Sequence, residues 1–242
     1  MTKKQAGKSS TSRASKKKTP AKAISAKKAA SRPKKSQTKK KSSKTSSIND
    51  TEKNTLYWIG IGASAGGLEA LRELVANIPR NALDNVTYIV AQHLSPKHQS
   101  MLVQLVGRET SIRVEELEDA TMPEPNVMYI TPPNSDVFVE NGVLHLREPI
   151  SEHSPKPSVD HFFTTLAEEL GDHAVGVILS GTGSDGARGI RAIRAAGGVT
   201  IAQNPGTAKY DGMPGSAIEL GGADLILRPE NIVKEIFSFI RH

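Results

Sequence analysis

The sequence predicts an α/β protein with a doubly wound, mostly parallel sheet, helices on both faces of that sheet and a small antiparallel excursion. From residue 56 onward, short apolar runs alternate with helical stretches, which is typical of strands joined by crossover helices. The apolar runs are hydrophobic at nearly every position, as strands covered on both faces are. Between 123 and 149, proline-rich and Asn-Gly turn signals predict antiparallel strands packed at one edge of the sheet.

The expected elements follow one another in strand-helix order. Strands are expected at 56–62, 86–92, 174–181 and 198–203. Helices are expected at 66–78, 97–107, 157–171, 185–197, 214–220 and 229–240. Because a helix follows each strand, the chain can return and begin the next strand in the same direction. A single domain, residues 55–242, accounts for all of these elements.

The first 50 residues differ in composition from the rest of the chain. They hold 17 of the 32 Lys and Arg residues and a single acidic residue, Asp50, for a net charge of +16. The remaining residues hold 15 basic and 24 acidic side chains, for a net charge of −9. A segment so charged and so poor in apolar residues cannot offset the entropy of ordering its backbone. We therefore expect residues 1–52 to form a disordered, Lys/Ser/Ala-rich basic tail.

The charge of this tail permits nonspecific contact with a polyanion, with an acidic partner or with the acidic remainder of the chain. The tail contains no aromatic residue on which a nucleic acid base could stack. A solubilising leader with no fixed partner is the alternative.

Composition also argues against several classes of protein. The chain has no cysteine to stabilise a secreted fold, no apolar segment of signal-peptide length and no run of 18 apolar residues. We therefore expect a cytoplasmic protein with no integral membrane segment. No cluster of histidine and acidic residues has a metal-ligand spacing such as HExxH, so we expect neither a metal nor another cofactor.

Three residues with chemically reactive side chains lie just after predicted strands or in the loops that follow them. Ser64 follows the first strand, His93 follows the second, and Asp185 lies in the loop after the strand at 174–181. In an open α/β sheet, ligands bind beyond the carboxyl ends of the strands, where these loops meet. A hydroxyl, an imidazole and a carboxylate together are the parts of a serine hydrolase, in which the imidazole accepts the serine proton and the carboxylate orients the imidazole.

The glycine-rich turn at 59–67 also resembles a dinucleotide-binding loop. That alternative requires an acidic residue near the end of the second strand to bind the ribose hydroxyls. The second strand ends instead in Gln92 and His93. The glycines are equally suited to a sharp turn that exposes a nucleophile and leaves amides free to bind an oxyanion.

Other roles stay open for these residues at the level of sequence. Ser64 could cap the helix that follows it, and Asp185 could cap the helix at 185–197. Four further residues could compete for a place in the site, namely His98 as the base, Asp211 as the carboxylate, and His153 and His161 as cleft residues.

Six motifs occur in an order that resembles one known family. They are "IGASAGG", "AQH", "PSVDHFF", "AVGVILSGTGSDGARG", "TIAQ" and "DGMPGSAI". From residue 58 to the C-terminus the chain resembles the catalytic domain of the chemotaxis receptor protein-glutamate methylesterase CheB, without its receiver domain. The resemblance implies a parallel-sheet α/β esterase that hydrolyses glutamyl methyl esters on chemoreceptors or related signalling proteins and that can also deamidate glutamine.

The resemblance also implies a role for each site residue. Ser64 would be the nucleophile, His93 the base and Asp185 the carboxylate, and the backbone amides near Ala65 and Thr182 would bind the oxyanion. A methylated chemoreceptor or another methylated signalling protein would be the partner.

The chain departs from the family pattern in three places. Residues 1–50 cannot fold as the N-terminal receiver domain that family members usually carry, so regulation by receiver phosphorylation is not expected here. Ala65 and Thr182 stand where the family commonly has Thr and Met, and Gly215 stands where an Arg is often found. A noncatalytic docking or signalling module with the esterase fold is the alternative function.

Overall fold

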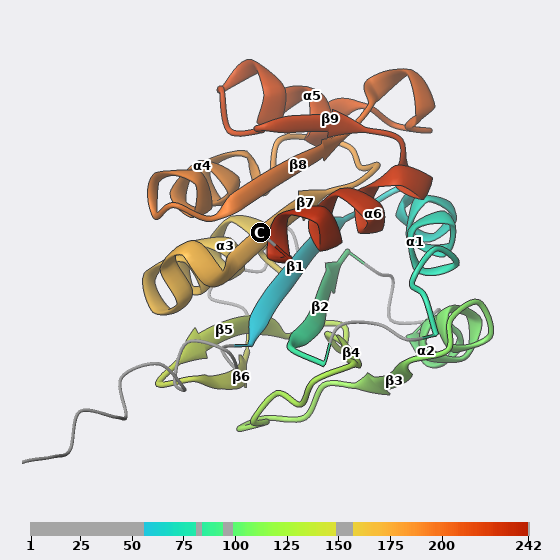
Figure 1. Cartoon of the computed structure of the whole chain (residues 1–242), viewed down its shortest axis with the longest axis vertical. Helices are drawn as coiled ribbons and strands as arrows, with labels where there is room; N and C mark the ends of the chain where they lie inside the picture. The colour runs from blue at the N-terminus through green and yellow to red at the C-terminus, as the bar shows by residue number, and fades with distance from the viewer. Residues whose placement is uncertain (1–55, 81–83, 94–98, 149–156, 242) are drawn as a thin grey trace, which may run out of the picture. The chain divides into compact units, whose positions relative to one another are not determined.

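A computed structural model describes residues 56–80, 84–93, 99–148 and 157–241 of the chain (Figure 1). The predicted tail at 1–52 lies outside the described residues, as do His98 and His153. None of the described helices has the length and the hydrophobicity needed to span a membrane.

The described residues contain one seven-stranded sheet in which every neighbouring pair of strands is parallel. The strand order is β3-β4-β2-β1-β7-β8-β9, and Figure 1 shows β9 near the top and β3 near the bottom. The strands are β1 (Tyr57–Ala63), β2 (Val86–Gln92), β3 (Arg113–Glu116), β4 (Val127–Ile130), β7 (Ala174–Ile178), β8 (Val199–Gln203) and β9 (Leu225–Leu227). This architecture confirms the predicted fold class.

Helices cover both faces of the sheet, and the sheet separates the hydrophobic core into two layers. One layer contains α1 (Gly67–Val75), α2 (Gln99–Gly107) and α6 (Pro229–Ile240). The other contains α3 (Val159–Leu170), α4 (Ala187–Ala195) and α5 (Gly212–Glu219). Alternate residues of one strand serve the two layers, since Ile59 and Ile61 of β1 belong to the first and Trp58 to the second. Two short 3₁₀ helices are η2 (Gly171–His173) and η3 (Pro205–Thr207).

A separate two-stranded antiparallel sheet joins β5 (Asp136–Glu140) to β6 (Val143–Arg147). Asn141 and Gly142 form the connection, with φ angles of 53° and 73°. Positive φ at both central residues is the requirement of a type I′ hairpin turn, which Asn-Gly adopts readily. The antiparallel excursion expected from the sequence is thus present.

The boundaries of that excursion are narrower than the sequence predicts. β4 lies within 123–149 but pairs with β2 and β3 in the main parallel sheet. All four of its residues are buried, as befits a strand covered on both faces. β3 and β9 were not expected, because β3 is the polar segment "RVEE" and β9 has three residues.

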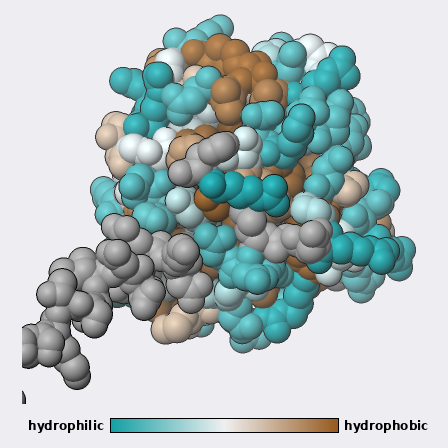
Figure 2. Space-filling view, viewed as in Figure 1, coloured by the Kyte–Doolittle hydropathy of each residue, from teal (hydrophilic) through white to brown (hydrophobic). Residues whose placement is uncertain are grey.

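β9 forms an edge of the sheet and leaves apolar side chains in contact with solvent. Leu225 and Ile226 are exposed, as is Leu220 just after α5. Figure 2 shows a hydrophobic patch at the top of the molecule, where Figure 1 places α5 and β9.

The sheet order places three strand ends next to one another at its centre. The chain passes from β1 through α1 to β2 on one side, while β7 pairs with the opposite side of β1. Ligand sites of doubly wound sheets occur at such a change of direction, beyond the carboxyl ends of the strands.

Candidate active site

Ser64 directly follows β1, in a turn that the neighbouring strand end stabilises. Its amide donates to the Ser180 carbonyl oxygen at 3.0 Å, and its own carbonyl oxygen accepts from the Gly67 amide at 2.9 Å. Gly66 lies between them with φ of 72°, a conformation that residues with a Cβ rarely adopt. Gly66, and not Ser64, occupies the cap position of α1, so the serine hydroxyl is free for another role.

His93 directly follows β2 and contacts both other predicted residues of the triad. Its backbone amide donates to the Ala63 carbonyl oxygen at 3.0 Å. Its Nδ1 lies 3.0 Å from Ser64 Oγ, and its Nε2 lies 3.0 Å from Asp185 Oδ2. If Nε2 carries the ring proton and donates a hydrogen bond to Asp185, the lone pair of Nδ1 can accept the serine hydroxyl proton.

Asp185 receives hydrogen bonds from the start of α3 as well as from His93. Oδ2 accepts from the Val159 amide at 2.8 Å, and Oδ1 accepts from the Asp160 amide at 3.0 Å. Ser158 is the cap residue of α3, so Asp185 adds a second acceptor to that helix start, and its Oδ1 also accepts from the amide of Gly186, the cap residue of α4, at 3.0 Å.

The carboxyl group of Asp185 is held in its charged form by these contacts. Burial raises its pKa, but hydrogen bonds from His93 and from the Asp160 and Val159 amides outweigh burial, and the pKa lies below its ordinary value of 3.8. With a side chain 10% exposed, Asp185 supplies a fixed negative charge behind the imidazole.

The two predicted oxyanion donors, the amides of Ala65 and Thr182, have no hydrogen-bond acceptor in the part of the chain that the structure describes. The Ser180 hydroxyl holds the peptide after Ala65, because it donates to the Ala65 carbonyl oxygen at 2.9 Å. The same hydroxyl accepts from the Tyr210 amide at 3.0 Å. Ser180 thus joins the turn that carries Ser64 to the loop before α5.

The triad faces a cleft of about 510 Å³. The lining residues come from the loops after β1, β2 and β7, from the starts of α3 and α4 and from the end of α5. They are Ser64, His93, Ser158, Asp160, Thr182, Gly183, Ser184, Asp185, Ala187, Arg188 and Leu220. The predicted nucleophile, the predicted base and one predicted oxyanion residue therefore line one cleft with room for a side chain of a substrate.

The remaining competitors lie elsewhere. Asp211 is exposed at the start of α5 and does not line the cleft. His161, on α3, lies 6.2 Å from Phe138 between ring centroids, and its Nε2 is buried without a partner. The described residues contain no group of three or more His, Cys, Asp or Glu side chains that could hold a metal.

Sequence reasoning did not assign roles to Asp160 and Arg188. Asp160 lies within the motif "PSVDHFF", and Arg188 lies within "SDGARG", so both belong to motifs that the sequence analysis quoted. Their contribution to the cleft depends on the approach of α3 to α4, which spacing along the chain does not reveal.

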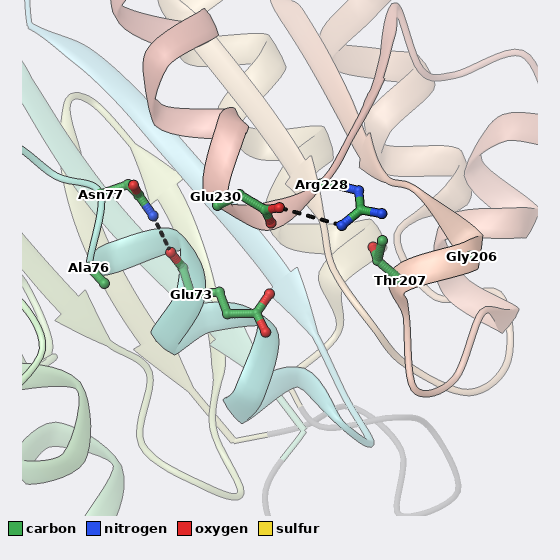
Figure 3. Close-up of a pocket in the computed structure, with 7 residues that line it drawn as sticks. All are labelled: Glu73, Ala76, Asn77, Gly206, Thr207, Arg228 and Glu230. Carbon is green, nitrogen blue, oxygen red and sulfur yellow. Dashed lines mark hydrogen bonds and ion pairs between the residues drawn. The ribbon is translucent and has the colours of Figure 1, made fainter.

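A second hollow, of about 590 Å³, lies between α1, η3 and the start of α6 (Figure 3). Arg228 and Glu230 form an ion pair across it at 3.7 Å. The Thr207 hydroxyl there donates to the Asn204 carbonyl oxygen at 2.8 Å. No histidine is among the seven described residues that line this hollow.

The sequence profile of the family described as CheB methylesterase matches residues 59–236. The chain belongs to the CheB methylesterase family. The resemblance predicted from the six motifs is thereby confirmed.

Individual relatives agree with this assignment. This CheB-family chain is 33% identical over 186 residues to protein-glutamate methylesterase/protein-glutamine glutaminase 1 of Geobacter sulfurreducens, an alignment that covers 74% of the chain and 51% of the relative. It is 34% identical over 188 residues to the protein-glutamate methylesterase/protein-glutamine glutaminase of Salmonella typhimurium, covering 75% and 52% respectively. The chain spans about half the length of the curated relatives it matches.

The structural comparison shows which half is shared. The crystal structure of the Thermotoga maritima CheB methylesterase catalytic domain matches with a TM-score of 0.70 and 28% identity. The match covers 76% of this CheB-family chain and 99% of the Thermotoga chain. The described residues thus correspond to a CheB catalytic domain.

Proposed function

We propose that residues 55–242 form a serine-dependent protein-glutamate methylesterase, which hydrolyses glutamyl methyl esters and releases methanol. The observation that carries this proposal is the chain of contacts from Ser64 Oγ through His93 to Asp185, at 3.0 Å on each side of the imidazole. Membership of the CheB family supports the choice of ester.

In the acylation step, His93 Nδ1 accepts the proton of Ser64 as Oγ attacks the ester carbonyl carbon. Asp185 stabilises the resulting imidazolium and fixes the tautomer of the neutral ring. The oxyanion of the tetrahedral intermediate is bound by the amides of Ala65 and Thr182, which have no acceptor among the described residues. The intermediate collapses when methoxide leaves with the proton from His93, which gives methanol and an acyl-serine.

Water completes the cycle through the same groups. His93 removes a proton from water, the hydroxide attacks the acyl-serine, and Ser64 leaves with that proton, which frees the glutamate carboxylate. Glutamine could enter the same cycle with ammonia as the leaving group. Relatives named protein-glutamine glutaminase support this second activity.

Replacement of Ser64 by Ala tests the proposal. Methanol release from methylated receptor membranes should fall by at least about 10³-fold, because the nucleophile is lost while the fold keeps its core. The Ser238→Ala variant is a matched control, since Ser238 is exposed on α6 and far along the chain from the triad. Undiminished methanol release by Ser64→Ala would reject the mechanism, and an inactive wild type would favour a noncatalytic docking module.

The wider context of the reaction is also proposed. The substrate is a methylated chemoreceptor or another methylated signalling protein, and the enzyme acts in the cytoplasm. Residues 1–52 form a basic tail that contacts polyanions through their charge alone. Salt-dependent binding to anionic vesicles or DNA by the full chain, compared with a chain that begins at residue 53, tests the tail.

A further inference from the structure

Arg188 places a guanidinium group at the mouth of the cleft. It is the second residue of α4, and it lines the same cleft as Ser64 and His93. Its side chain is 83% exposed, so a substrate that approaches the nucleophile meets this cation in water.

One carboxylate restrains both the backbone and the side chain of Arg188. Arg188 Nε donates to Asp160 Oδ2 at 2.9 Å. Asp160 Oδ1 accepts from the amides of Arg188 and Gly189, each at 2.9 Å. Because the side chain of Asp160 is only 15% exposed and is held by α4, the guanidinium is anchored at Nε. The hydrogen bond and the charge of Asp160 also raise the pKa of Arg188, which therefore stays protonated.

The outer end of the guanidinium is available to a ligand. Within the described part of the chain, neither terminal nitrogen of Arg188 has a hydrogen-bond acceptor. With Nε occupied, the two terminal nitrogens still present a planar pair of donors that matches the two oxygens of a carboxylate.

The acidic groups of the cleft do not remove the ability of Arg188 to bind a substrate carboxylate. Asp185 already accepts from His93, from two amides of α3 and from the Gly186 amide, and Asp160 accepts from the Arg188 side chain and from two amides of α4. A substrate cation would find both carboxylates occupied, whereas a substrate carboxylate would find free N–H donors.

We propose that Arg188 is a specificity-determining residue that binds a carboxylate next to the scissile ester, so that the enzyme prefers glutamyl methyl esters flanked by Asp or Glu. This inference rests on the proposed esterase function, and it adds a substrate class that the triad alone does not define.

Two peptides that differ only in the residue beside the methyl ester test the inference with the full chain. Both contain a glutamyl methyl ester, flanked by Glu in one peptide and by Gln in the other. Wild type should show a kcat/KM about fivefold higher for the acidic peptide, the size of effect expected of an exposed ion pair. The preference should reside in KM and should shrink when salt is raised to about 0.5 M, because salt screens exposed charges.

Variants at the same position separate charge from shape. Arg188→Gln should bring the ratio of the two kcat/KM values to about one, and Arg188→Glu should favour a third peptide flanked by Lys. Arg191→Gln is the matched control, because Arg191 is an exposed arginine of the same helix that does not line the cleft. It should keep the wild-type preference.

The two proposals fail in different ways. If wild type releases methanol from the peptides but Arg188→Gln keeps the acidic preference, the role of Arg188 is overturned and the esterase stands. The same conclusion follows if wild type shows no preference at low salt. If wild type releases methanol from none of the peptides, the esterase function itself is overturned, and the selectivity with it.

Discussion

At the scale of single residues, the site depends on groups that each serve two neighbours. His93 lies between Ser64 and Asp185, and Asp185 in turn binds both His93 and the first amides of α3. The imidazole is therefore oriented by a carboxylate that a helix N-terminus already fixes. A carboxylate so placed interacts favourably with the positive end of the helix dipole.

This arrangement predicts how stability depends on pH. Because the folded-state pKa of Asp185 is lowered, its contribution to stability is complete above the ordinary value of 3.8 and is lost as pH falls through the folded value. Asp185→Asn should lower the free energy of unfolding by about 1.5–3 kcal/mol at pH 7, since the amides and His93 lose a charged acceptor. That difference should shrink below pH 3.8, as urea unfolding from pH 7 down to the acid limit of the fold would measure.

The matched control is Asp211→Asn, because Asp211 is exposed at the start of α5 and makes no side-chain capping bond. It should change the free energy of unfolding by less than about 0.5 kcal/mol. A difference for Asp185→Asn that stays constant through the acid range would contradict the assigned role of its charge.

At the scale of elements, α3 and α4 are joined by crossed contacts. Asp185 precedes α4 but accepts from the first two amides of α3, while Asp160 lies in α3 and accepts from the Arg188 and Gly189 amides in the first turn of α4. The two helices approach closely at Gly189, where a Cβ would lie 2.6 Å from Phe163 Cβ and 2.7 Å from the Asp160 carbonyl oxygen. Packing at this contact thus positions two residues of the cleft.

A pair of Gly→Ala substitutions tests this packing. Gly189→Ala should destabilise the fold by about 1–3 kcal/mol, because the added methyl group overpacks the contact with α3. Gly215→Ala, on α5, should stabilise it by up to about 1 kcal/mol, since a Cβ there meets nothing within 4 Å and alanine favours helix. Thermal or urea unfolding measures both changes, and shifts of equal sign would contradict the argument.

At the scale of the whole molecule, the sequence predicts the fold class and the place of the site because both depend on strand order along the chain. Ser64 and His93 follow buried parallel strands, whose carboxyl ends necessarily share one edge. Their contact is therefore accessible to sequence reasoning, although the catalytic roles remain a prediction.

Other features depend on tertiary contacts that no local pattern encodes. β3 forms from the polar segment "RVEE" because β4 offers it a parallel partner, and β4 itself joins the main sheet through β2. Likewise, the hydrogen bond from the Val159 amide of α3 to Asp185 joins residues 26 positions apart in the sequence. The approach of Asp160 to Arg188 is of the same kind.

The most direct test of the central claim is covalent labelling of the full chain with a fluorophosphonate, a reagent that reacts with activated serine hydroxyls. The reagent should release fluoride and transfer one phosphonyl group to the wild-type protein, and peptide mass spectrometry should locate that group on Ser64. His93→Gln should react at least about 10²-fold more slowly, because the general base is absent. Labelling at another residue, or equal rates for wild type and His93→Gln, would contradict the assignment of Ser64 as a nucleophile activated by His93.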